Sequence, residues 1–176
     1  MESIQRSPRG AANQALAITV AFVLLRLVAS FYVGLGTNEA YAIASGRAMS
    51  LSYFDHPPLH FWLAHLGEGI FGDTRGVRLF FILMGGGTSW LMFAFTRRLF
   101  GDRAGVWAVL SLNLSGFFGF VSASWILPDG PLNFFLLAAA LALAPIGEGK
   151  PLSLRRWLAA GLLTGLAALS KYHAIF

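Results

Sequence analysis

The chain has no cysteine and few charged residues. Of its 176 residues, 12% are Asp, Glu, Lys or Arg, whereas a soluble domain carries about a quarter. The absence of cysteine excludes a disulfide framework and a thiolate metal site. Because 56% of the residues are hydrophobic and the mean hydropathy is +0.65, the composition indicates an integral membrane protein.

Five apolar runs are long enough to be considered as membrane spans. At ~1.5 Å per residue, about 20 residues cross a hydrocarbon core of roughly 30 Å. The first run exceeds the ~7–15 apolar residues of a signal peptide, so we expect an uncleaved span. The sequence therefore predicts an all-α membrane protein. The expected spans are residues 15–35, 76–96, 105–125, 131–147 and 157–175.

Two features of these runs lead to further expectations. Arg26 interrupts the first run, and an arginine at that depth normally faces protein, so we expect it to pack against later helices. The last run is still apolar at Phe176. We therefore expect residues 1–176 to form the N-terminal part of a longer multi-span domain.

The net charge of +5 follows from membrane topology. If the N-terminus is cytoplasmic, eight of the 13 basic residues lie on the cytoplasmic side, as the positive-inside rule requires. These eight are Arg6, Arg9, Arg97, Arg98, Arg103, Lys150, Arg155 and Arg156, against Arg47, Arg75, Arg78 and Lys171 on the other side. No nucleic-acid partner is needed to explain the charge.

The first extracytoplasmic loop, residues 36–75, is expected to contain two helices lying in the membrane interface. Asn38 is a suitable N-cap for a helix that extends to about Met49. Pro57 and Pro58 can open a second helix. The apolar face of that second helix is formed by Leu59, Trp62, Leu63, Leu66 and Ile70.

Three acidic residues are the candidate catalytic groups: Glu39 and Asp55 in this loop, and Asp129 in the turn sequence "LPDGP". Partial desolvation at a membrane boundary raises a carboxyl pKa toward neutral, which suits a general base or a metal ligand. Simpler roles remain open. Glu39 and Asp55 also complement helix dipoles, and Asp129 also fits ordinary turn chemistry.

Histidines and a lysine accompany these acids. The spacing of His56, His60 and His65 matches no zinc motif, so we expect no histidine metal site, although two acids at one site leave a divalent cation open. His56 is expected to contact an anion or a hydroxyl group. Lys171 lies about 22 Å along a helix from Arg156. It either snorkels to the interface or binds a lipid phosphate.

The segment "NEAYAIASGRAMSLSYFDHPPLHFWL" resembles the first outer loop of GT-C membrane glycosyltransferases. It is most similar to the protein-mannosyltransferase-like family 39 and the aminoarabinose (lipid A) transferases. The matching residues are Glu39 with Ala40 and the block from Asp55 to Leu59. "PDGPL" and "LSKYHA" resemble further family segments. The family usually has Asp where this chain has Asn38.

The resemblance implies a GT-C helical bundle in a bacterial inner membrane, without a required cofactor. It implies sugar transfer from a polyprenyl-phosphate donor to a lipid, polysaccharide or protein acceptor on the extracytoplasmic side. Glu39, Asp55 and Asp129 would be catalytic, and His56 and Lys171 would bind the donor phosphate. Two alternatives remain: a transporter or flippase of lipid-linked sugar, and an inactive truncated relative. The 176-residue chain alone is expected to be inactive.

Overall fold

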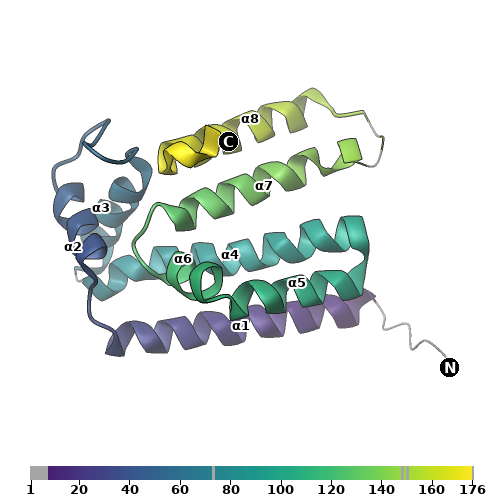
Figure 1. Cartoon of the computed structure of the whole chain (residues 1–176), viewed down its shortest axis with the longest axis horizontal. Helices are drawn as coiled ribbons and strands as arrows, with labels where there is room; N and C mark the ends of the chain where they lie inside the picture. Colours follow the sequence, from purple (N-terminus) through teal and green to yellow (C-terminus); the bar gives the residue numbers. More distant parts are fainter. Residues whose placement is uncertain (1–7, 73, 148, 150, 176) are drawn as a thin grey trace.

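The fold was described from a computed structural model that defines residues 8–72, 74–147, 149 and 151–175. Arg6, Asp73, Lys150 and Phe176 lie outside the described residues. Long helices run side by side, and two shorter helices lie across one end of the bundle (Figure 1). The helices that run side by side are α1 (Pro8–Tyr32), α4 (Thr74–Phe100), α5 (Asp102–Leu114), α7 (Asp129–Gly147) and α8 (Leu154–Ser170).

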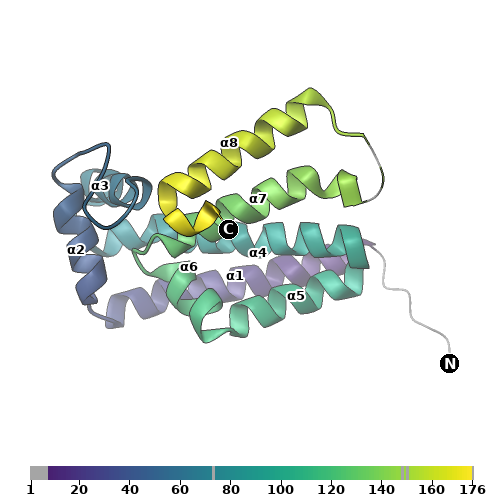
Figure 2. The same ribbon diagram turned by 45° about the horizontal axis from the view of Figure 1, so that its top comes forward.

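The helices that lie across one end, α2 (Thr37–Gly46) and α3 (Leu59–Phe71), define what we call the loop end of the bundle. The loop end also contains residues 125–128, which precede α7, and residues 171–175, which follow α8. Gly101, the end of α7 and the start of α8 lie at the opposite end, near the start of α1 (Figure 1). In the turned view, α8 lies beside α7 and away from α1 (Figure 2).

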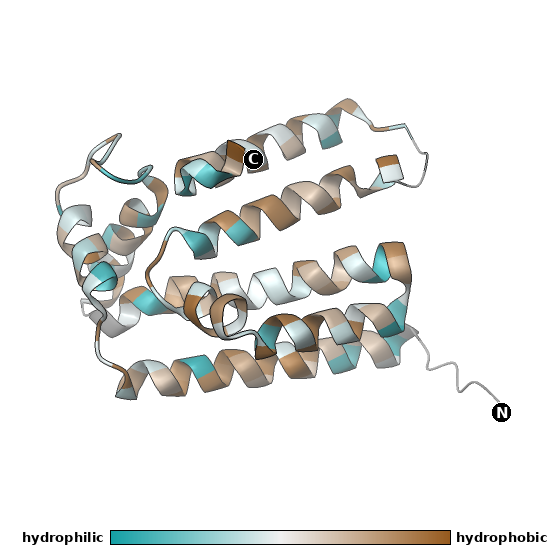
Figure 3. Ribbon diagram, in the orientation of Figure 1, coloured by the Kyte–Doolittle hydropathy of each residue, from teal (hydrophilic) through white to brown (hydrophobic). Residues whose placement is uncertain are grey.

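The described residues form an all-α membrane protein, as the sequence predicts. Among the described residues, three helices are long and apolar enough to cross a membrane: Arg9–Tyr32, Gly76–Phe100 and Asp129–Gly147. Their ribbons are largely hydrophobic (Figure 3). The bent pair Asp102–Leu114 and Gly116–Ser124 makes a fourth if it is taken as one span. The predicted fifth span over 157–175 corresponds to a 17-residue helix that ends at Ser170. It ends there because Lys171 has extended backbone angles, with φ −155° and ψ 139°.

The predicted third span is bent, whereas the sequence suggested one continuous helix over 105–125. Helix α5 ends at Leu114, and the π-helix η1 (Gly116–Val121) and short α6 (Ser122–Ser124) follow at an angle of 81°. The bend requires glycine at position 119, since a Cβ there would lie 2.3 Å from the Asn113 carbonyl oxygen.

Arg26 stabilises this bend. Its Nε donates to the Gly119 carbonyl at 2.8 Å, and its Nη2 donates to the same carbonyl and to Asn113 Oδ1, both at 2.5 Å. These bonds connect α1 to the end of α5 and to the bent segment that follows it. The expectation that Arg26 packs against later helices is therefore confirmed.

The two short helices differ in detail from the prediction. The N-cap of α2 is Gly36 instead of Asn38, and the helix ends at Gly46. The start of α3 after Pro58 agrees with the sequence. Leu66 and Ile70 of its predicted apolar face are exposed, which suits a helix lying on lipid. The opposite face packs into a core of Ala42, Ile43, Phe61, Ala64, Val77, Phe81 and Ile126.

Candidate active site

Glu39 lies at the centre of the loop end and is 1% exposed. Arg78 Nε donates to its Oε1 at 2.7 Å, and Arg78 Nη2 donates to its Oε2 at 2.5 Å. The backbone N–H of Ile126 also donates to Oε1 (3.2 Å), and that of Gly36 to Oε2 (2.9 Å). Each carboxylate oxygen of Glu39 thus already accepts two hydrogen bonds.

Arg78 extends this network to the end of α1. Its Nη1 donates to the Val33 carbonyl at 2.7 Å, and its Nη2 donates to the Gly34 carbonyl at 2.9 Å. Such a bidentate arginine–carboxylate pair fixes geometry as well as charge. The pair therefore joins the end of α1, the start of α2, the first turns of α4 and the segment that precedes α7. Sequence reasoning missed this role, because Arg78 was considered only as a basic residue on the outer side.

Asp55 lies in the loop before α3, with its side chain 38% exposed. Tyr41 of α2 donates its hydroxyl to Oδ1 at 2.9 Å, and His56 Nδ1 lies 3.2 Å from Oδ2. Burial raises the pKa of the Asp55 carboxyl, but the Tyr41 hydrogen bond, the residue's own backbone and His56 outweigh it. The pKa therefore lies below its usual value, and the expectation of a raised pKa is wrong for Asp55. Tyr41 was not identified from the sequence.

Asp129 and Lys171 form an ion pair. Asp129 is the first residue of α7, Lys171 directly follows α8, and Nζ lies 2.7 Å from Oδ1. Both side chains are mostly buried, at 16% and 23% exposure. The adjacent Gly130 lets α7 approach α6, since a Cβ there would lie 2.8 Å from the Ser122 carbonyl. The structure thus brings together two of the residues singled out in the sequence.

His60 lies near both groups of charged residues. Its ring centroid is 5.5 Å from that of His56. Burial, together with the positive charges of His56 and Lys171, lowers the pKa of His60 to about 3, against a smaller opposing effect of Asp55. His60 is therefore a neutral, buried side chain within electrostatic range of three predicted site residues.

A cavity of about 370 Å³ separates the loop before α3 from the end of α8. Its lining includes Pro57 and Pro58, which follow His56, and Tyr172, which follows Lys171. Among the described residues, no three His, Asp or Glu side chains are grouped closely enough to hold a metal ion. Asp55, His56, Asp129 and Lys171 are not themselves among its lining residues, but each of the two pairs places a carboxylate beside a cationic or hydrogen-bonding side chain.

Two curated proteins are similar in sequence to part of this chain. An undecaprenyl phosphate-α-4-amino-4-deoxy-L-arabinose arabinosyl transferase from Pseudomonas fluorescens is 30% identical over 128 residues, which is 70% of this chain and 22% of that protein. An uncharacterized protein from Aquifex aeolicus is 31% identical over 114 residues, 61% of this chain and 22% of that protein. The chain thus spans about a fifth of these relatives' length. No solved structure matches it.

A family model provides the broader match. The model described as dolichyl-phosphate-mannose-protein mannosyltransferase matches residues 55–176. The match includes Asp55, His56, Asp129 and Lys171, and it begins after Glu39. Because it covers more than half of the residues, the chain belongs to the dolichyl-phosphate-mannose-protein mannosyltransferase family.

Proposed function

We propose that the protein transfers a sugar from a polyprenyl-phosphate-linked donor to a hydroxyl acceptor at the loop end, on the extracytoplasmic side of a bacterial inner membrane. The observation that carries this proposal is the 2.7 Å Asp129–Lys171 ion pair near the Asp55–His56 pair, with His60 within electrostatic range of Lys171, Asp55 and His56. The name of the Pseudomonas relative supports a polyprenyl-phosphate donor. The acceptor is a lipid, a polysaccharide or a protein.

In this proposal Asp55 is the general base. Its side chain is partly exposed, so an acceptor hydroxyl can approach it from outside the membrane. Its lowered pKa keeps it ionised at neutral pH. As the acceptor oxygen bonds to the anomeric carbon, Asp55 takes the hydroxyl proton. The bond between that carbon and the phosphate oxygen breaks, and its electron pair stays with the lipid phosphate.

Lys171 and His56 would stabilise the negative charge that develops on the departing phosphate. Donors that face such a developing charge contribute strongly to catalysis, and a lysine ammonium binds phosphate as a point charge. Asp129 holds Lys171 in place through its Oδ1. Asp129 thereby positions the ammonium group that would face the departing phosphate. Loss of Asp129 would leave that ammonium group without its ion-pair partner.

We assign Glu39 a positioning role within the catalytic set. A base needs a free lone pair, and both Glu39 oxygens already accept two hydrogen bonds. Its bond from Ile126 N–H instead fixes the segment that leads to Asp129. If the Asp that the resembled family usually has at the position of Asn38 is the base in that family, Asp55 takes that role here in this proposal, in place of Glu39.

The proposal is tested with the protein in native membrane vesicles and a polyprenyl-phosphate donor labelled in its sugar. Asp55→Asn should abolish transfer of the label and Lys171→Met should reduce it by about 10²–10³-fold, both at unchanged protein level, while Glu68→Gln in the same outer loop should retain it. Full activity in both of the first two variants would overturn the site assignment. Movement of intact donor across the bilayer without cleavage of the sugar–phosphate bond would favour the transporter alternative.

A further inference from the structure

Arg26 has hydrogen-bonding capacity beyond its structural role. It is 1% exposed, in the middle of an apolar helix. Its Nε and Nη2 are bonded to Gly119 and Asn113, and Phe22 lies 5.9 Å below its guanidinium group. Its Nη1 is buried without a hydrogen-bond partner, and no carboxylate among the described residues pairs with it. An unpaired charge in a membrane span is costly and commonly marks a functional site.

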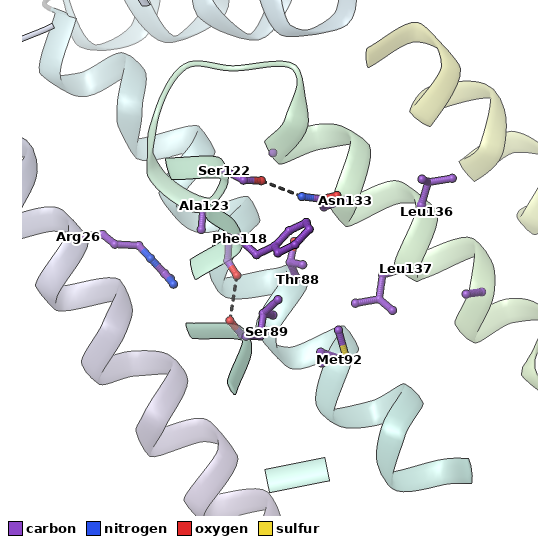
Figure 4. A pocket seen from close by; sticks show the side chains of 14 residues that line it. Arg26, Thr88, Ser89, Met92, Phe118, Ser122, Ala123, Asn133, Leu136 and Leu137 are labelled. Atoms are coloured by element: carbon purple, nitrogen blue, oxygen red, sulfur yellow. Dashed lines mark hydrogen bonds between the residues drawn. The ribbon is translucent and has the colours of Figure 1, made fainter. Parts of the chain in front are cut away.

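A cavity of about 410 Å³ adjoins this side chain (Figure 4). It lies between α4, the bent segment from α5 to α6, and α7. Its lining includes the apolar Met92, Phe118, Leu136, Leu137 and Ala140, and the polar Thr88, Ser89, Ser122 and Asn133. Irregular backbone at membrane depth is tolerated where it lines a cavity or is buried in protein, and π-helical turns are frequent at functional sites. The bend at Ser115 therefore fits a binding site.

The buried charges at this end of the bundle favour an anion. Two arginines, Arg26 and Arg78, are at most 3% exposed, and both line a small cavity of about 10 Å³ between them. Glu39 is the carboxylate that pairs with Arg78. Among the described residues, three features of the Arg26 side of the cavity therefore lack a partner: the positive charge of the guanidinium, its free Nη1 donor, and the apolar lining. An occupant with several acceptor oxygens and an apolar chain would satisfy all three.

We propose that the cavity between α4, α5–α6 and α7 binds a lipid through its phosphate group, with Nη1 of Arg26 as the cationic donor. Arg26 lies six residues before Tyr32, roughly 9 Å along the helix from the loop end. A headgroup drawn inward from that interface reaches it. The lipid chain packs on Leu136, Leu137 and Ala140. The lipid is either a bilayer phospholipid or a polyprenyl phosphate, and the site is separate from Asp129 and Lys171.

The test measures lipid binding to the purified, delipidated protein by native mass spectrometry, so that its result is independent of transferase activity. The probes are phosphatidylglycerol, a polyprenyl monophosphate, and their phosphate-free counterparts diacylglycerol and polyprenol. Arg26→Gln removes the charge, and Arg156→Gln, at an exposed position, is its matched control. Ala140→Phe fills the cavity and leaves Arg26 in place, with Ala159→Phe on the exposed side of α8 as its control.

We expect a phosphate-bearing lipid to bind better than its phosphate-free counterpart. Arg26→Gln should weaken that binding about tenfold, Ala140→Phe should abolish it, and both controls should bind like the wild type. Preference for one of the two phosphate lipids identifies the source of the phosphate. Equal binding of charged and uncharged lipids, or binding unaffected by Ala140→Phe, would overturn the proposal.

Discussion

The ammonium group of Lys171 and the carboxylate of Asp129 lie 2.7 Å apart, although 42 residues separate them in the chain. The pair joins the end of α8 to the start of α7 at the loop end. Neither residue has a second charged partner among the interactions found in the described part of the chain. The position of each side chain therefore depends directly on the other.

Variants of this pair should lose transferase activity together. If Lys171 stabilises the leaving phosphate, Lys171→Met should lower kcat by about 10²–10³-fold, the range typical of a lost donor to a developing anion. Asp129→Asn should cause a similar loss, and the double variant should be little worse than either single variant, since both act through one group. Losses that multiply in the double variant would show that the two residues act independently.

Glu39→Gln should destabilise the fold. Removing one partner of a buried ion pair leaves the other charge uncompensated, at a cost of about 3–5 kcal/mol. Arg78 and Glu39 are 3% and 1% exposed, so little solvent screening reduces this effect. The measurement is the free energy of unfolding in detergent, followed by circular dichroism.

Glu68→Gln provides the matched control for that measurement. Glu68 also forms an ion pair with an arginine, Arg47, but the arginine side chain is 64% exposed. An exposed pair of this kind contributes about 0–1 kcal/mol. Equal destabilisation by Glu39→Gln and Glu68→Gln would contradict the central role given to Glu39.

Tyr41→Phe should alter the pH dependence of transfer. The Tyr41 hydroxyl is one of the groups that lower the pKa of Asp55, so its removal should raise that pKa. A base acts when ionised, so activity is present above the pKa of Asp55 and is lost as the pH falls through it. The acidic limb of the kcat/KM profile should therefore move to higher pH. An unchanged acidic limb would argue against Asp55 as the base.

His60 should make the protein less stable in acid. Its pKa of about 3 in the folded protein is below the value of about 6.5 in an unfolded chain. Between about pH 3 and pH 6.5, His60 therefore binds a proton in the unfolded state but not in the folded state. Stability is unaffected above pH 6.5 and falls by up to roughly 1.4 kcal/mol for each pH unit below it.

Thermal unfolding between pH 7 and pH 4 would measure this effect. His60→Gln should flatten the pH dependence, because it removes the titrating group. His65→Gln should leave it unchanged, since His65 is exposed. A slope that survives in His60→Gln would assign the acid sensitivity to other residues.

Gly119→Ala should disrupt the bend after α5. The new methyl group would lie 2.3 Å from the Asn113 carbonyl oxygen, and such overpacking costs about 1–3 kcal/mol or more. Gly161→Ala in α8 is the control, because a Cβ there meets nothing within 4 Å. We expect that control to be neutral or slightly stabilising, as measured by the unfolding temperature of both variants.

The sequence predicted features that depend on local composition. Apolar length identified α1, α4 and α7 as spans, and the proline pair identified the start of α3. The family motifs directed attention to Asp129 and Lys171, which proved to be paired. In each case the signal lies within a short stretch of residues.

Features that depend on distant contacts were missed. The 81° bend after Leu114 depends on Gly119 meeting Asn113 and on Arg26 from another helix. The full hydrogen bonding of the Glu39 carboxylate depends on Arg78, which is 39 residues away in the chain. The lowered pKa of Asp55 depends on Tyr41 from the preceding helix, whereas the sequence alone suggested only desolvation. No local pattern specifies which partner a polar side chain will meet.

The bond from Ile126 N–H to Glu39 has a consequence for the order in which the chain folds during synthesis. When a ribosome has made residues up to the end of α4, Glu39 can already meet Arg78 and Gly36, but its fourth donor does not yet exist. That donor arrives only after α5 and the bent segment have been inserted. The first outer loop therefore reaches its final hydrogen bonding 87 residues after Glu39 itself is made, and a nascent chain stalled before that point would hold this loop incompletely formed.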